Sequence, residues 1–271
     1  MKLKPGYKRT EVGVIPEEWE VDRARNLASI TTGTRNTQDK IEGGAYPFFV
    51  RSSHVERINT WAFDGGAVLT AGDGVGTGKV FHYINGKFDF HQRVYKISNF
   101  SERLDGYFFY LFFSVRFYER IMSMTAKSSV DSVRMEMIAD MEVPLPPIHE
   151  QRAISTALSN VDALISSLDK LIAKKRDIKQ AAMQQLLTGR RRLPGFGGEW
   201  EVESVQDIGY VVTGGTPKTE VKEYWGGEYP WVTPTDISHY RDVVDTERRL
   251  TAKGLEATVK LPANSVLVTC I

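Results

Sequence analysis

Apolar residues recur at steps of three and four along residues 147–189, and this spacing predicts one long helix. Proline suits the first helical turn, so Pro146-Pro147 favours a start there, and Gly189 favours a stop. With about 40 residues rising about 1.5 Å each, such a rod would be roughly 60 Å long. The apolar positions fit a, d and e of a heptad and are Ile154, Leu158, Val161, Leu164, Ile165, Leu168, Leu171, Ile172, Ile178 and Leu186.

So many large apolar side chains are too costly to leave in water, so we expect a partner helix along the stripe. The alternative is an ordinary long helix that its own domain covers. Lys175 at an a position and Gln185 at a d position would weaken the pairing towards the end of the helix.

Residues before the helix alternate between short apolar runs and glycine turns, which predicts strands at 67–70, 79–83 and 94–97. An aromatic segment, 104–122, predicts a helix. The fold class is therefore α/β (α+β), a mixed α/β domain followed by a long coiled-coil-forming helix. The side chains expected in the core from that aromatic segment are Tyr107, Phe108, Tyr110, Leu111, Phe112, Val115 and Tyr118.

Two parts of the chain resemble each other, one on each side of the predicted long helix. Glu18-Trp19-Glu20-Val21 matches Glu199-Trp200-Glu201-Val202, and Gly43-Gly44-Ala45-Tyr46-Pro47 matches Gly226-Gly227-Glu228-Tyr229-Pro230. This period is far longer than that of a solenoid, so we expect a duplicated domain.

The second copy ends at the point that matches Thr70-Ala71 of the first, so we expect it to be partial, with a partly exposed core. Three parts are predicted: a first domain over 1–146, the long helix over 147–189, and a linker with a partial second domain over 190–271.

Charge is unevenly distributed along the 271 residues, although the net charge is only +1. Residues 1–147 carry +1, residues 148–192 carry +5 and residues 193–271 carry −5. The positive end of the helix could attract phosphate, although basic residues also match the dipole of a helix C-terminus. A single cysteine, Cys270, excludes a disulfide framework, and with no apolar run long enough for a membrane span we expect a cytoplasmic protein.

The glycine-rich stretch 72–79 is similar to a phosphate-binding loop but does not fit one. A P-loop would need glycine where Asp73 stands and serine or threonine where Val80 stands. We expect a hairpin tip with Lys79 at its base, which could present backbone N–H groups to phosphate or a base edge. A plain glycine turn is the alternative.

Known catalytic motifs are absent from the sequence or match it only formally. The five histidines show no metal spacing, no serine lies in a nucleophile elbow, and there is no Asn-Pro-Pro-Tyr motif of an amino-methyltransferase. Asp207 with Glu220 and Lys222 matches a nuclease pattern only formally. No catalytic residue, metal site or cofactor of the chain's own is therefore predicted.

Polar side chains that suit base recognition cluster in four loops of the first domain. Arginine fits guanine edges, and asparagine or glutamine fits adenine. Each loop alone is weak support, because surface loops are normally polar. The candidate DNA-binding residues are Thr34, Arg35, Asn36, Arg51, Ser52, Ser53, His54, Gly74, Gly76, Lys79, His91, Gln92, Arg93, Lys127 and Ser128.

Several motifs together resemble the DNA specificity subunit of type I restriction-modification systems. They are Ile15-Pro16-Glu17-Glu18-Trp19, Thr32-Gly33-Thr34, Val143-Pro144-Leu145-Pro146-Pro147-Ile148-His149-Glu150-Gln151, Leu186-Leu187-Thr188-Gly189 and Thr213-Gly214-Gly215-Thr216-Pro217. The resemblance spans the whole chain, and its most specific part is the proline motif that opens the long helix.

This resemblance implies two target recognition domains, each reading one half of a split double-stranded DNA site, with antiparallel helices setting the distance between them. Methyltransferase subunits would hold those helices and bring S-adenosylmethionine, and a separate motor-nuclease subunit would cut. The specificity subunit would have no active site. Since a second rod is missing, we expect two copies of the chain to pair their helices antiparallel as a homodimer. The alternatives are a stand-alone DNA-modifying or DNA-cleaving enzyme, and a coiled-coil adaptor without DNA affinity.

Overall fold

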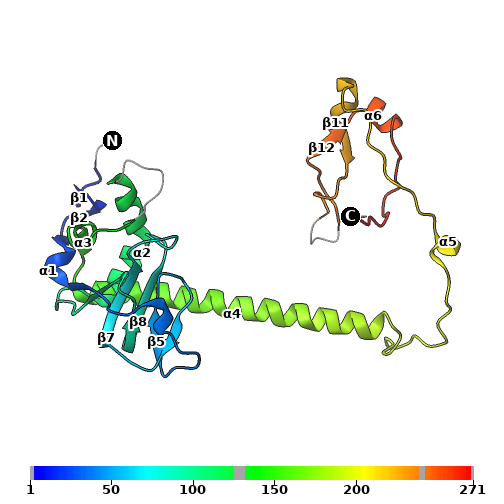
Figure 1. Ribbon diagram of the computed structural model, residues 1–271. Helices are drawn as coiled ribbons and strands as arrows, with labels where there is room; N and C mark the ends of the chain where they lie inside the picture. Colours follow the sequence, from blue (N-terminus) through cyan, green and yellow to red (C-terminus); the bar gives the residue numbers. More distant parts are fainter. Residues whose placement is uncertain (1–2, 125–131, 238–241, 270–271) are drawn as a thin grey trace. The chain divides into compact units, whose positions relative to one another are not determined.

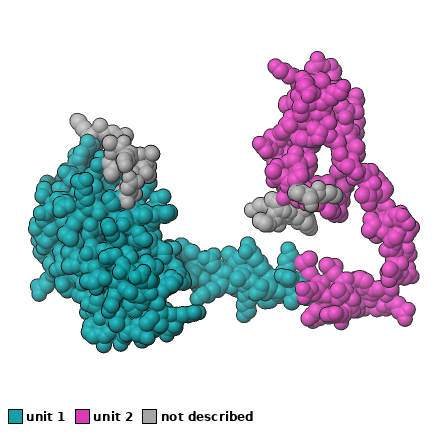
Figure 2. Space-filling view, in the orientation of Figure 1, with its two compact units in different colours: residues 1–181 teal, residues 182–271 magenta. Residues whose placement is uncertain are grey.

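A computed structural model describes residues 3–124, 132–237 and 242–269 (Figure 1). The chain divides into two compact units, Met1–Ala181 and Ala182–Ile271, called unit 1 and unit 2 below (Figure 2). The division falls inside the longest helix, α4 (Ile148–Leu186).

A six-stranded sheet of order β4-β9-β7-β8-β5-β6 forms the centre of unit 1. Its pairs are antiparallel except for β5 and β8, which run parallel. The strands are β4 (Ser29–Thr32), β5 (Tyr46–Phe49), β6 (Glu56–Ile58), β7 (Phe63–Ala71), β8 (Phe81–Phe90) and β9 (Val94–Ser98). The three predicted strands are thereby confirmed, with β8 beginning two residues later than expected.

Both faces of the sheet are covered, as the central strand β7 makes clear. Successive side chains of a strand point to opposite faces. Ala67 and Leu69 pack in a cluster with Phe88, whereas Val68 between them packs in the larger cluster that includes the helix α2 (Gly106–Ser123). An almost continuous apolar run in β7 is the consequence.

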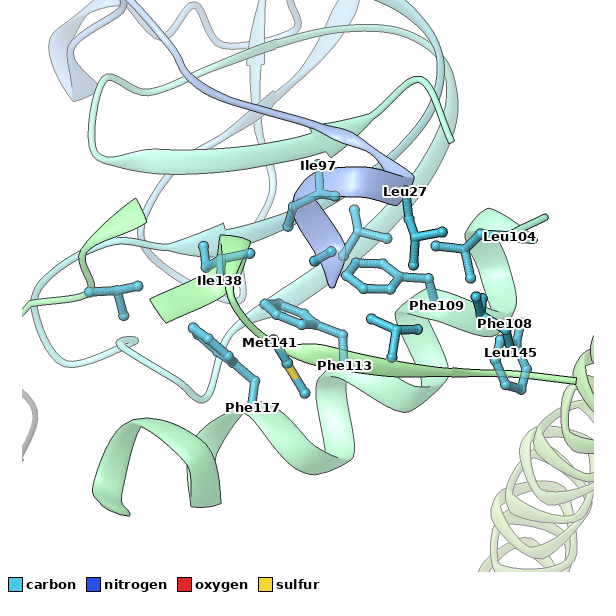
Figure 3. Close-up of a cluster of buried hydrophobic side chains, with 14 of the residues drawn as sticks. Leu27, Ile97, Leu104, Phe108, Phe109, Phe113, Phe117, Ile138, Met141 and Leu145 are labelled. Atoms are coloured by element: carbon cyan, nitrogen blue, oxygen red, sulfur yellow. The ribbon is translucent and has the colours of Figure 1, made fainter. Parts of the chain in front are cut away.

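α2 begins at Asp105, whose carboxylate accepts hydrogen bonds from the backbone N–H groups of Tyr107 and Phe108. One line of side chains, spaced one turn apart, faces the sheet (Figure 3). Its rings stack on one another, with centroid distances of 5.2 Å from Phe109 to Phe113 and 4.4 Å from Phe113 to Phe117. These rings are the centre of the unit 1 core.

The predicted core face of α2 was mostly wrong. Of the seven expected side chains only Phe108 is buried; Tyr107, Tyr110, Leu111 and Phe112 are partly buried, and Val115 and Tyr118 are exposed, Val115 by 71%. The first half of the helix, residues 106–113, is apolar all the way round, so its sequence contains no polar face that would fix the orientation. The packing of α2 against the sheet decides it instead.

Short elements close unit 1 on either side of the sheet. β3 pairs antiparallel with β10, which brings the beginning of the domain next to the residues that lead into α4. The elements are β1 (Tyr7–Thr10), β2 (Gly13–Pro16), β3 (Glu20–Arg23), α1 (Ala24–Leu27), η1 (Thr37–Asp39), α3 (Met135–Ala139) and β10 (Glu142–Leu145).

The first two turns of α4 are fixed to unit 1 by a buried amide. The side chain of Gln151 is fully buried: its Oε1 accepts from Asp105 N at 2.9 Å, and its Nε2 donates to the carbonyls of Arg103 and Pro146, each at 2.8 Å. Ile154 packs against the same core, so its assignment to helix pairing is corrected: it serves its own domain.

Beyond Ser155, every residue of α4 up to Ala181 is exposed, so the alternative of a helix covered by its own domain is wrong for this stretch. Figure 1 shows α4 leaving the body of unit 1 as a single uninterrupted helix. The predicted stop is also confirmed, because Gly189 has a φ of +69° and its N–H donates to the carbonyl of Leu186. Among the described residues, no helix combines the length and hydropathy that a membrane span requires.

The described residues of unit 2 after α4 form short elements with few buried side chains. Leu250 is buried, but Val202 is 98% exposed and Val211 is 83% exposed, in agreement with the expected partly exposed core. The elements are α5 (Val205–Ile208), η2 (Lys222–Tyr224), β11 (Trp225–Trp231), β12 (Arg248–Leu250) and α6 (Ala252–Glu256).

Candidate nucleic-acid interface

The loops that carry the candidate DNA-binding residues lie next to one another in unit 1. Arg35 forms an isolated parallel bridge with His91, and Gln92 N donates to the Arg35 carbonyl at 2.8 Å. His91 N donates to the Phe49 carbonyl at 2.9 Å, at the end of β5 from which Arg51 follows. The loops after β4 and β5 and the turn before β9 therefore meet.

The glycine-rich stretch joins β7 to β8, which confirms the predicted hairpin connection. Gly72 N donates to the Arg93 carbonyl at 2.8 Å, and a Cβ on Gly76 would collide with the carbonyl of Arg51. Gly74 has a φ of +79°, where glycine is strongly favoured. This loop therefore joins the other three, and two of its glycines are required by close approach or by backbone conformation.

The tip of the glycine loop is held by its own hydrogen bonds. Thr77 N donates to the Gly74 carbonyl, and the N–H groups of Lys79 and Val80 both donate to Gly76. These three donors are engaged inside the turn, so the expectation that the loop offers its backbone to phosphate does not extend to them. Val75 at the tip is 99% exposed instead.

Two arginines of this surface share one carboxylate. Arg51 Nη1 lies 2.8 Å from Asp73 Oδ1, and Arg93 Nη1 lies 3.7 Å from Asp73 Oδ2. The arginine side chains are 45% and 64% exposed. Lys79 is exposed as well, with its ammonium 5.7 Å from the ring centre of Tyr118. Guanidinium groups thus remain open to solvent on a surface fixed by glycine turns.

Arg35 differs from these two arginines, because it pairs with a buried carboxylate. Asp89 Oδ2 lies 3.3 Å from Arg35 Nε and accepts from Thr60 Oγ1 at 2.7 Å, while Asp89 Oδ1 accepts from Phe90 N. A buried carboxylate without such partners would be strongly destabilising. Asp89 and Thr60 were not among the predicted residues; an aspartate between Phe88 and Phe90 in an apolar strand was the available signal.

Amide and hydroxyl side chains connect the same loops. Gln92 Nε2 donates to Asn36 Oδ1 at 2.6 Å, and Asn36 takes part in the capping box of η1. Ser52 Oγ donates to the His54 carbonyl at 3.1 Å. Thr34 and Ser53 are exposed beside them. Asn36 and Gln92 are therefore paired with each other by a side-chain hydrogen bond.

Two histidines beside these loops, His82 and His91, are expected to be neutral at neutral pH. Burial lowers the pKa of His91, and the positive charge of Arg51 lowers it further. Burial also lowers the pKa of His82, partly offset by the Ser52 carbonyl 3.2 Å from its Nε2. Since His91 is buried and its Nδ1 accepts from Arg93 N, it supports the loop rather than presenting a ring to solvent.

Lys127 and Ser128 lie outside the described residues, so their predicted role is neither supported nor opposed. The chain after them returns to the same surface: Val133 N donates to the Gly72 carbonyl at 2.7 Å, and Ser132 forms an isolated bridge with Asp73.

Over the described ranges, no cluster of three or more histidine, cysteine, aspartate or glutamate residues could hold a metal ion. Asp207, from the formal nuclease pattern, instead takes part with Ser204 in the capping box of α5.

A second candidate surface is the exposed apolar stripe of α4. Its side chains are each about half exposed although all are large and apolar, and they are spaced at three and four residues along one face. They are Leu158, Val161, Leu164, Ile165, Leu168, Leu171, Ile172 and Ile178.

A mixed α/β domain with polar loops gathered on one surface, followed by a long exposed helix, defines a DNA-recognition domain with a spacer helix. The family described as "Type I restriction modification DNA specificity domain" matches residues 16–176, and the chain belongs to this family of specificity subunits.

Two relatives of the chain are specificity subunits of type I restriction enzymes. The EcoDI specificity subunit of Escherichia coli is 29% identical over 176 residues, which are 65% of this chain and 38% of that protein. The MjaVIII specificity subunit of Methanocaldococcus jannaschii is 23% identical over 222 residues, 74% of this chain and 51% of that protein. The chain thus spans about half, or less, of the length of these relatives.

A solved structure of the type I restriction-modification S subunit from M. genitalium has a similar fold. It superposes with a TM-score of 0.50 at 18% identity, over 85% of this chain and 60% of that one. This likeness confirms the mixed α/β fold with a long helix.

Proposed function

We propose that the chain is a sequence-specific DNA-binding subunit of a cytoplasmic type I restriction-modification complex, which reads one half of a split target and has no catalytic activity. The supporting observation is that loops from separate parts of unit 1, with the exposed Arg51, Lys79 and Arg93, meet on one surface. Family membership supplies the context of the complex.

The geometry divides the candidate residues into two groups. Side chains that are exposed on the loop surface are proposed to contact DNA, because base edges and phosphates must be reached from solvent. Arg35 and His91 are proposed to hold the loops in place, since one pairs with Asp89 and the other is buried. The proposed contacts are Thr34, Asn36, Arg51, Ser52, Ser53, His54, Lys79, Gln92 and Arg93.

Selection from a randomised double-stranded DNA pool, followed by sequencing of the bound fraction, tests this proposal. The purified chain should enrich one short motif, and binding should weaken steeply with salt. Arg51→Ala should relax the preference at one position, about 1–3 kcal/mol, whereas Lys79→Ala should weaken all sequences alike. Lys87→Ala, an exposed lysine near the other end of β8, is the matched control and should change neither.

For the spacer helix, we propose antiparallel pairing with α4 of a second copy. The exposed stripe requires a partner helix, and charge favours the antiparallel direction. Residues 148–167 contain one basic and two acidic residues, whereas residues 168–186 contain five basic and two acidic residues. A parallel pair would bring the two basic halves together, and an antiparallel pair places each basic half beside an acidic one.

Light scattering coupled to size-exclusion chromatography tests the pairing. The chain should be a dimer at micromolar concentration, and Leu168→Glu should make it a monomer because it places a charge in the centre of the stripe. Ala163→Glu, which adds the same charge on the opposite face of α4, should remain a dimer. A wild-type chain that is strictly monomeric at high micromolar concentration would rule the pairing out.

Catalysis is proposed to reside in partner subunits that the paired helices bind: methyltransferase subunits, which bring S-adenosylmethionine, and through the complex a motor-nuclease subunit. The chain alone, incubated with DNA, magnesium and S-adenosylmethionine, should neither cleave nor methylate. Either activity in a preparation free of other subunits would favour the alternative of a stand-alone enzyme. A chain that dimerises without DNA affinity would be the coiled-coil adaptor.

A further inference from the structure

Asp73 lies between two arginines that reach it from different parts of the sheet. Arg51 follows β5 and Arg93 precedes β9, and each presents its Nη1 to a different oxygen of the Asp73 carboxylate. The backbone just before Asp73 is fixed, since Gly72 donates to the carbonyl of Arg93 and accepts from Val133 N. The carboxylate therefore has a defined position from which it can orient both side chains.

Stability does not explain this arrangement. The two arginine side chains are about half exposed or more, and ion pairs of such exposure contribute little to the free energy of unfolding. A carboxylate on a DNA-binding surface also repels phosphate, so Asp73 opposes the general attraction that the arginines provide. The geometry offers one benefit that can offset this repulsion: Asp73 orients both arginine side chains.

We infer that Asp73 is a positioning residue for base recognition, which holds Arg51 and Arg93 in orientations that read guanine in the major groove. The inference rests on the proposed function of this surface in DNA binding. A guanidinium has five N–H donors in a fixed fork, so one contact with Asp73 leaves donors for the O6 and N7 acceptors of guanine. Ordering two long side chains in advance lowers the entropy lost when DNA binds.

The inference predicts opposite changes in affinity and in specificity when the charge of Asp73 is removed. Asp73→Asn keeps the size of the side chain, but it weakens the hold on the two arginines and deletes one negative charge. Binding to duplexes outside the selected motif should become tighter, most clearly at low salt. The preference for guanine at one position of the motif should fall by about tenfold or more.

The experiment uses the full chain and a randomised duplex pool, with the bound fraction sequenced for each variant. Asp64→Asn is the matched control, because Asp64 is exposed and lies near the other end of β7. It removes the same charge, so it should leave the selected motif unchanged. A purely structural role of Asp73 would change the melting temperature without separating the two binding measurements.

An Asp73→Asn variant that folds and keeps the wild-type guanine preference overturns the inference. If that variant does not fold, Arg51→Lys and Arg93→Lys test the same claim, since each keeps its charge but loses the guanidinium fork. At least one of these two variants should lose the guanine preference, while its affinity for duplexes outside the motif stays nearly unchanged. An unchanged guanine preference in both variants overturns the inference. A wild-type chain that selects no motif refutes the proposed function itself, and this inference with it.

Discussion

The hairpins β5–β6 in unit 1 and β11–β12 in unit 2 are built from the same sequence motif and have the same local structure. Tyr46 pairs with Ile58 in the first, and Tyr229 pairs with Leu250 in the second. In both, a glycine before the tyrosine packs so closely against the opposite strand that any Cβ would collide with backbone atoms. The two copies that the sequence predicts therefore share a structure at this level.

An arginine side chain repeats as well. Arg57 donates from Nε to the Gly44 carbonyl and from Nη2 to the Ala45 carbonyl, and Arg249 donates from Nη1 to the carbonyl of Glu228, which matches Ala45 in the motif. Each arginine donates to backbone carbonyls just before the tyrosine of the motif. Local sequence is sufficient to specify this arrangement, because it recurs where the surroundings differ.

The surroundings of the two hairpins differ in what covers them. Phe48 of β5 and Ile58 of β6 are buried in the six-stranded sheet, and β5 pairs also with β8. In unit 2, the hairpin is covered mainly by its own side chains. Trp225 and Trp231 contact each other edge to face, and Arg248 lies 3.6 Å from the ring centre of Trp225. A two-stranded hairpin is only marginally stable by itself. The same motif is therefore expected to have different stability in the two units.

The largest expected difference between the two units is the loss of unfolding free energy when the core of unit 1 is changed. Phe113→Ala removes a fully buried ring between Phe109 and Phe117 and should cost about 3–5 kcal/mol of unfolding free energy. Denaturant titration followed by circular dichroism measures it. Hydrogen exchange at the amides of β11 and β12 should report an unchanged unit 2.

Val115→Ala is the control for that change, since Val115 lies on the same helix but is largely exposed. It should alter the free energy of unfolding by less than about 0.5 kcal/mol. Equal losses in the two variants would mean that the described core face of α2 is not the one that stabilises unit 1.

A smaller loss is expected at the junction of unit 1 with α4. Gln151→Ala leaves three buried partners of the amide unsatisfied, the N–H of Asp105 and the carbonyls of Arg103 and Pro146, and should cost about 2 kcal/mol or more. Hydrogen exchange should then increase in the first turns of α4 and at the start of α2. Gln185→Ala, an exposed glutamine near the end of the same helix, should change neither.

How much of this could be predicted from the sequence depends on whether the determining contacts are local. The long helix and the glycine hairpin were predicted correctly because periodicity and glycine positions define them within one segment. The buried face of α2 was not, because an almost wholly apolar helix is oriented only by the sheet it meets. The pairing of Arg35 with Asp89 was missed for the same reason, since it joins two strands distant in the chain.

For the candidate site, the sequence identified the loops but not the roles of their side chains. Polar loops after strands can be recognised from composition, and three of the four meet in the described structure. Whether an arginine points to solvent or to a carboxylate depends on residues such as Asp73 and Asp89, which lie on other segments of the chain. Patterns within a single sequence do not show which arginine pairs with which carboxylate.

The glycines of the shared motif allow a direct comparison of the hairpins. Gly44→Ala and Gly227→Ala each introduce a Cβ that collides with the opposite backbone. In unit 1 the shift must be absorbed by a packed sheet, so a loss of about 1–3 kcal/mol is expected. In unit 2 the hairpin has little packing to lose, so opening of the strand pair is expected without a cooperative change elsewhere.

Hydrogen exchange at the amides of Ile58 and Leu250 distinguishes the two outcomes. Gly44→Ala should speed exchange across several strands of the sheet, and Gly227→Ala should speed it only in β11 and β12. Matching, strictly local effects in both units would contradict the conclusion that packing, rather than the hairpin motif, separates their stabilities.

The smallest expected effect is the pH dependence that His91 gives to the stability of unit 1. Burial lowers the pKa of His91 below that of an unfolded histidine, about 6.5. Above that pH neither state binds the proton, so His91 makes no pH-dependent contribution. As the pH falls below about 6.5, the unfolded chain binds the proton first, and stability decreases until the folded pKa is passed.

Melting temperatures of unit 1 between about pH 5 and pH 8 test this sign. His91→Asn should flatten the dependence, because the amide oxygen can accept from Arg93 N as Nδ1 does but does not titrate. A wild-type slope retained in His91→Asn would show that the titration belongs to another group, with His82 the next to replace, because burial lowers its pKa as well.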